Sequence, residues 1–236
     1  RSAQDFDSFG ALNRVERMRL HSAIAVWVSA LCVLTGGCGS SGDSCANGSG
    51  PIISQTLDLS GLTGVDFQTA GAVTVALGTT QQVMVRGEEN IINLLKTDVI
   101  NGIWEIGFDE CVNNISELRI DITVPEFDSA ELSGAGTINA ETDSNQFDTT
   151  LTGAGTITIT GGSTQHNVTL EGSGTIEAFG MVATEATVDL AGEGTIRVRA
   201  NERLTVDLSG AGAVFYKGDP MLDIRISGAG EVVDAN

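Results

Sequence analysis

A pair of glycines separated by one residue recurs through the second half of the chain at intervals of 18 to 20 residues. One apolar column lies two residues before each pair, and another lies two residues after it. A repeat this short constrains the fold more than any other feature, because one unit can bury its apolar residues only against its neighbours. The pairs are Gly134 and Gly136, Gly153 and Gly155, Gly172 and Gly174, Gly192 and Gly194, Gly210 and Gly212, and Gly228 and Gly230.

Strands are indicated on both sides of each glycine pair. Apolar and polar residues alternate there, as in 188–190 and 206–208, which is typical of strands with one buried face. Stacked units of this kind predict an all-β protein, a right-handed parallel β-helix (β-solenoid) with glycine-cornered coils of 18–20 residues. A propeller blade needs about 40 residues, twice this period. We expect the corner glycines to supply backbone conformations with positive φ.

The apolar columns predict the inside of the solenoid. Leu occupies the position before the pair in all units but the last, which has Ile, and Ile or Val occupies the position after it. Stacking of identical residues from coil to coil would bury both columns. The columns are Leu132, Leu151, Leu170, Leu190, Leu208 and Ile226, and Ile138, Ile157, Ile176, Ile196, Val214 and Val232.

The pattern is less regular upstream of Pro125. Residues 67–73 align with 132–138, which predicts one further corner. We divide residues 51–236 into an irregular N-terminal β part at 51–124 and regular β-helix repeats at 125–236. The expected elements of the irregular part are strands at 82–86, 103–106 and 118–124 and one short helix at 90–96.

Residues 1–37 are typical of an upstream extension followed by a signal peptide. Met18 precedes a short basic segment and an apolar run at 23–34. This run is shorter than the roughly 20 residues that a membrane-spanning helix needs. We expect translation to start at Met18 and the signal peptide to direct export.

The apolar run ends in a Gly-Gly-Cys segment that resembles a bacterial lipobox. Thr35 departs from the pattern, which prefers Leu at that position. We expect Cys38 to be lipidated and residues 38–50 to form a flexible tether. Glycine directly after Cys38 favours sorting to the outer membrane, with the protein facing the periplasm or the cell surface.

Two further cysteines, Cys45 and Cys111, follow Cys38 in the sequence. An even number of remaining thiols in an oxidising compartment favours a disulfide between them. Two separate thiols are the alternative, because the sequence does not show that these residues meet.

Charge and histidine content exclude several functions. Acidic residues outnumber basic residues 31 to 12, which gives a net charge of −19 and excludes binding of nucleic acid through a basic face. His166 is the one histidine after the signal segment, so a His-based triad or multi-His metal site is excluded. The glycine pairs lack the strand, helix and acid of a dinucleotide site. We therefore expect no cofactor.

Asp189 and Asp207 hold the same repeat position in adjacent coils, about 5 Å apart. Arg225 follows them in the next coil. Stacked carboxylates suit a calcium site, an acid/base pair for glycoside hydrolysis, or a solvated face. We favour the solvated face and expect no bound metal, which leaves Asp189 and Asp207 as the weak candidates for calcium ligands.

Several segments resemble the GIN-domain family of bacterial auto-transporter adhesin head domains. They are 57–62, 87–90 and 101–106, together with the repeated Ser-Gly-Ala-Gly corners. The resemblance covers residues 51–236. It implies a right-handed parallel β-helix, export to the envelope and a lipid anchor, and it carries no catalytic residues.

These observations predict a non-enzymatic envelope lipoprotein, an adhesin or binding module that presents an acidic β-helix surface. Its partner would be an envelope or extracellular ligand, either glycan or protein, and it would meet the membrane through its lipid anchor. The alternative is a small carbohydrate-active β-helix enzyme, a calcium-dependent lyase or hydrolase. Acids and arginines clustered in one cleft would favour that alternative.

Overall fold

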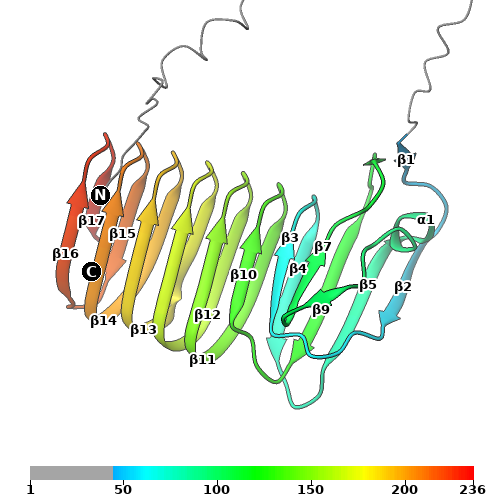
Figure 1. The fold of residues 1–236 in the computed structure, drawn as a ribbon, viewed down its shortest axis with the longest axis horizontal. Coiled ribbons are helices and arrows are strands. Elements are labelled where there is room, and N and C mark those ends of the chain that lie inside the picture. Colours follow the sequence, from blue (N-terminus) through cyan, green and yellow to red (C-terminus); the bar gives the residue numbers. More distant parts are fainter. Residues whose placement is uncertain (1–44) are drawn as a thin grey trace, which may run out of the picture. The chain divides into compact units, whose positions relative to one another are not determined.

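The computed structural model describes residues 45–236. They form a stack of flattened coils that begins with an irregular block of strands (Figure 1). In chain order the elements are β1 (Ala46–Asn47), β2 (Ile52–Leu57), β3 (Gly64–Phe67), β4 (Ala72–Leu77), β5 (Gln82–Glu88), α1 (Glu89–Ile92), β6 (Val99–Ile100), β7 (Ile103–Ile106), β8 (Val112–Asn113), β9 (Leu118–Val124), β10 (Ser129–Leu132), β11 (Thr137–Leu151), β12 (Thr156–Leu170), β13 (Thr175–Leu190), β14 (Thr195–Leu208), β15 (Ala213–Lys217), β16 (Met221–Ile226) and β17 (Glu231–Asp234).

Each regular coil is one long strand that bends in its middle and contributes to two faces. The first half of β11 pairs in parallel with β4, and its second half pairs in parallel with β10. The first face contains β4, the starts of β11–β14, β15 and β17, and the second face contains β3, β10, the ends of β11–β14 and β16. The predicted β-solenoid is confirmed.

The strands are longer than the sequence indicated, because β11 and β12 stay paired through the bend. Thr142 pairs with Gly161 and Ser144 with Ser163 at that point. Between β11 and β12 the pairing therefore continues from one glycine corner to the next. The register shifts at the bend between β13 and β14, and in the last coil the bend separates β15 from β16.

The predicted inward columns form the core. Every Leu of the first column is fully buried, and Leu151, Leu170 and Leu190 are register partners. The last coil differs, because no further strand among the described residues covers it. Ile226 ends the Leu column and is 49% exposed.

The corner glycines act differently from our expectation. Among the described residues, none of the glycines in the six repeat corners has a positive φ, whereas the upstream corner glycine Gly71 does, at 141°. A Cβ atom on Gly172 would collide with the carbonyl oxygen of Gly153 in the preceding coil. That oxygen accepts a hydrogen bond from the backbone N–H of Ser173 at 3.3 Å. Glycine is required because successive corners stack backbone on backbone.

The irregular block covers the N-terminal end of the stack with antiparallel strands. β5 pairs antiparallel with both β2 and β9, and β6 pairs antiparallel with β7. The expected strands of this part are present as β5, β7 and β9. The alignment of 67–73 with 132–138 is confirmed by the pairing of Phe67 with Leu132 and Val73 with Ile138.

The helix of the block is shorter than predicted. α1 ends at Ile92, and Leu95 already lies in an isolated bridge with Phe108. Ile91 and Ile92 are buried, so the helix packs against the strands of the block.

The start at Met18, the signal peptide and lipidation of Cys38 concern residues outside the described range. Between residues 45 and 236, no helix has the length and apolar character needed to cross a membrane.

Candidate binding surface

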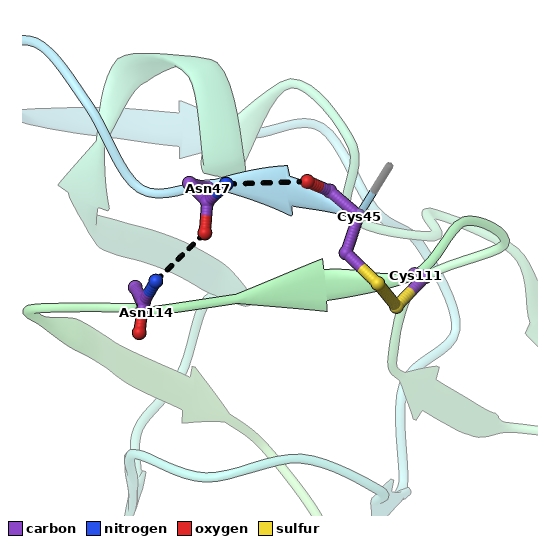
Figure 2. Close-up of a disulfide and its surroundings, with 4 residues drawn as sticks. All are labelled: Cys45, Asn47, Cys111 and Asn114. Atoms are coloured by element: carbon purple, nitrogen blue, oxygen red, sulfur yellow. Dashed lines mark hydrogen bonds between the residues drawn. A yellow bond between two sulfur atoms is a disulfide. The ribbon is translucent and has the colours of Figure 1, made fainter. Parts of the chain in front are cut away.

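A disulfide joins Cys45 and Cys111, whose Cα atoms are 4.6 Å apart (Figure 2). The bond holds β1 beside β8 in a parallel pair. The side-chain amide of Asn114 donates a hydrogen bond to the Asn47 side-chain oxygen at 2.7 Å. These contacts attach the segment from Cys45 onward to the block.

His166 is an inward-facing core residue of β12. Its Nε2 atom lies 2.9 Å from Oγ1 of Thr149, and both side chains are buried. Burial lowers the pKa of His166 to about 4, and the nearby Asp148 carboxylate partly opposes this shift. The imidazole is therefore a neutral, hydrogen-bonded part of the core.

Asp189 and Asp207 are register partners on β13 and β14, and both are exposed. Arg225 is the next residue in this column, but it forms an ion pair with Asp223, at 3.5 Å. Within residues 45–236, no three His, Cys, Asp or Glu side chains are grouped so that they could hold a metal ion. The two aspartates lie together on the outer side of the second face.

The same outward column carries more acids upstream. Glu105, Asp66 and Glu131 are successive register partners on β7, β3 and β10. Burial raises the pKa of Glu131, and the Asp66 carboxylate raises it further. Glu131 holds the same repeat position as Asp189 and Asp207. Extending the alignment of 67–73 with 132–138 by one residue places Asp66 opposite Glu131, whereas Glu105 has no glycine pair beside it to align it.

A surface pocket of about 320 Å³ lies near the bend of β11. Burial raises the pKa of Asp128 there, and the charges of Glu126 and Asp148 add to the shift. The side-chain amide of Asn167 donates a hydrogen bond to Asp148 at 2.8 Å. The pocket thus combines three carboxylates with amide donors.

Two aromatic rings on the first face each have a cation above them. Arg197 Cζ lies 5.2 Å from the ring centroid of Phe215, and Lys217 Nζ lies 4.7 Å from that of Phe179. All four side chains are half-buried. We call Phe179, Arg197, Phe215 and Lys217 the aromatic–basic cluster.

Strand register assembles this cluster. Glu177, Arg197 and Phe215 are partners on β13, β14 and β15, and Arg197 Nη1 forms an ion pair with Glu177 at 3.2 Å. Arg199 pairs with Lys217 in the neighbouring column and is exposed. The inward columns of the repeat do not reveal the cluster, because its members face outward. The cluster could have been found by aligning the outward positions of the repeat in the same way. That alignment places Phe215 one coil after Arg197.

The fold defines a class, that of glycine-cornered parallel β-solenoids. Residues 61–220 match the family model described as "putative auto-transporter adhesin, head GIN domain". The chain belongs to this family. No protein of curated function matches it.

Solved structures share the architecture. The structure of a "putative adhesin" from Bacteroides fragilis NCTC 9343 has a TM-score of 0.67 and 20% identity, over 80% of this chain and 99% of that one. A "putative lipid binding protein" from Parabacteroides distasonis ATCC 8503 has a TM-score of 0.50 and 19% identity, over 79% of this chain and 98% of that one. At these identities the similarity shows a common fold.

Proposed function

We propose that the protein is a non-enzymatic, lipid-anchored adhesion module of the outer membrane, and that it binds an acidic glycan through the aromatic–basic cluster. The observation that carries the proposal is the pairing of Phe179 and Phe215 with cations on one sheet face. Membership of a family named for adhesins supports binding to an external ligand. The anchor at Cys38 is supported by the lipobox-like sequence.

The chemistry of the cluster suits an acidic sugar. The half-buried rings of Phe215 and Phe179 hold the cations of Arg197 and Lys217 in place over their faces. The planar guanidinium of Arg197 matches the geometry of a carboxylate or sulfate, and Lys217 adds a second positive charge. Because all of these side chains lie on paired strands, their spacing is fixed before the ligand arrives.

The surrounding charge favours this location over others. The chain carries a net charge of −19, and acid columns occupy the second face. We propose that these acid columns repel anionic ligands. The last coils differ, because they hold most of the basic residues that follow Cys38. These are Arg197, Arg199, Arg203, Lys217 and Arg225.

The test is a glycan array probed with the compact unit Asp43–Asn236, with and without calcium. We expect retention of glycans with uronic acids or sulfates, weakened by salt. The Arg197→Gln and Phe215→Ala variants should each bind at least about ten times more weakly, a loss of about 1.4 kcal/mol. Arg119→Gln is the matched control, because Arg119 is an exposed first-face cation in β9, outside the cluster.

Three results would overturn the proposal. The first is that the protein retains only neutral glycans, or no glycan at all. The second is that Arg119→Gln weakens glycan binding as much as Arg197→Gln and Phe215→Ala do. Cleavage of a retained glycan would instead favour the carbohydrate-active alternative.

The anchor is tested separately by the mass of the full chain expressed in a Gram-negative host. We expect a mature protein that begins at a diacylglyceryl Cys38 and partitions into detergent. A Cys38→Ala protein that still carries diacylglycerol would contradict this assignment.

A further inference from the structure

Within residues 45–236, no strand covers β16 at the C-terminal end of the coil stack. β16 is the last strand of the second face (Figure 1). All six of its residues are exposed. The exposed fractions of its apolar side chains are 64% for Met221, 46% for Leu222, 37% for Ile224 and 49% for Ile226. The N-terminal end, by contrast, is covered by antiparallel strands and α1.

The exposed row of β16 continues the solenoid core. Leu222, Ile224 and Ile226 pair with Leu204, Val206 and Leu208 of β14, and these three residues are fully buried. Their counterparts in β16 are covered on one side only. An apolar strand at a sheet edge also offers unpaired backbone groups, so it is prone to pair with another strand.

Charges on the strand select one partner. Asp223 and Arg225 flank Ile224 on the outward side, and they carry opposite charges. In an antiparallel pair of two β16 strands centred on Ile224, Asp223 of each copy lies opposite Arg225 of the other. Leu222 then lies opposite Ile226, so apolar residues also match.

We propose that β16 is a dimerisation edge, which pairs antiparallel with β16 of a second copy about a two-fold axis at Ile224. Such an interface is isologous, because the same strand serves both copies. The proposal does not depend on the glycan site, which lies on the outer side of the first face.

Other registers are less favourable. A slip of one residue turns the apolar row of one copy toward the solvent side of the other. A centre at Asp223 places two aspartates opposite each other, and a centre at Arg225 does the same with two arginines, which costs stability. The charge order therefore specifies the register.

The edge strand of the first face is less suited to pairing. β17 is partly covered at Val232 and Val233. It also carries Glu231 and Asp234, which would meet the acids of a copy. β17 also extends the first face one strand beyond β15, so the two copies must tilt apart on that side. We therefore assign the pairing to β16 alone.

Sedimentation equilibrium of Asp43–Asn236 tests the proposal with charge reversals. We expect a concentration-dependent dimer whose Kd rises at least about ten-fold in Asp223→Arg and in Arg225→Asp, equal to about 1.4 kcal/mol each. The double variant Asp223→Arg/Arg225→Asp restores opposite charges across the axis, so its Kd should return toward the original value. Far-UV circular dichroism and thermal melting check that each variant folds.

Cysteine cross-linking tests the register independently. Residues opposite each other in an antiparallel pair have Cβ atoms about 5 Å apart, close enough for a disulfide. Ile224→Cys should therefore give a cross-linked dimer under mild oxidation, because position 224 faces itself. Leu222→Cys is the matched control and should stay uncrosslinked, because position 222 faces position 226.

A monomer at all concentrations would overturn the proposal. So would a dimer that both charge reversals leave unchanged, or a double variant that does not recover. A dimer that is instead weakened by Ile100→Thr, at the opposite end of the stack, would show that the interface lies there.

Discussion

The imidazole of His166 and the hydroxyl of Thr149 are hydrogen bonded across adjacent coils, 2.9 Å apart in the core. Because burial lowers the pKa of His166 from 6.5 to about 4, the unfolded chain binds more protons than the folded chain between these pH values. The neutral imidazole stabilises the fold fully above pH 6.5. We expect the free energy of unfolding to fall by about 3 kcal/mol as the pH drops from 6.5 to 4.

The measurement is the difference between the original chain and His166→Gln in denaturant titrations from pH 7 to 4. A difference is needed because Asp128 and Glu131 have raised pKa values, so their protonation stabilises the fold as the pH falls. Parallel stability curves for the two proteins would show that His166 does not titrate in the expected way.

Leu170 lies between Leu151 and Leu190 in the buried column, so truncating it should leave a cavity. We expect Leu170→Ala to lose about 2–5 kcal/mol of unfolding free energy. Thr175→Ala is the control, because Thr175 is half-exposed on the outer side, and it should lose less than about 1 kcal/mol. Chemical denaturation measures both, and equal losses would contradict the assignment of the inward column.

Gly172 stacks against the backbone of Gly153, so any side chain there must push the coils apart. We expect Gly172→Ala to lower the unfolding free energy by more than about 2 kcal/mol. Gly162→Ala is the matched control. Its Cβ would have only one contact within 4 Å, at 3.7 Å from the carbonyl oxygen of Val182. Thermal melting compares the two variants, and a tolerated Gly172→Ala would argue against close corner stacking.

Asp189 and Asp207 allow a test for calcium. We expect millimolar calcium to raise the Tm no more than sodium chloride of the same ionic strength, because only a specific ligand stabilises the native state preferentially. The double variant Asp189→Asn/Asp207→Asn should be slightly more stable, since a stack of like charges has been removed. Calorimetry decides the matter. A calcium-specific rise in Tm that the double variant abolishes would identify a metal site.

The regular coils could be predicted because strand pairing repeats the same residue types at each position. Leu151, Leu170 and Leu190 align in the sequence with the spacing at which they stack in space. The register between two paired coils is strongly specified, because a slip of one residue would turn every buried side chain of the strand toward solvent. Column alignment thus predicts both fold and register.

The N-terminal block and the aromatic–basic cluster were harder to predict, for different reasons. The antiparallel pairing of β2 with β5 joins segments without a repeat, so no column aligns Ile53 with Gly87. The cluster members follow the repeat, but they contact one another as unlike residues, such as Arg197 and Phe215. A search for the same residue type in each coil does not detect such contacts. The corner glycines were recognised correctly, while their role depended on how close adjacent backbones come.

The two ends of the stack differ, because the N-terminal block covers one end and β16 is exposed at the other. This difference indicates an order in which the coils can fold. β2–β9 come first along the chain and present a finished template, on which each later coil can dock through its immediate neighbour alone. Folding can therefore advance in the order in which the chain is synthesised, without waiting for distant segments. By the same logic, evolution can lengthen or shorten the protein by whole units of 18 to 20 residues while both ends stay intact.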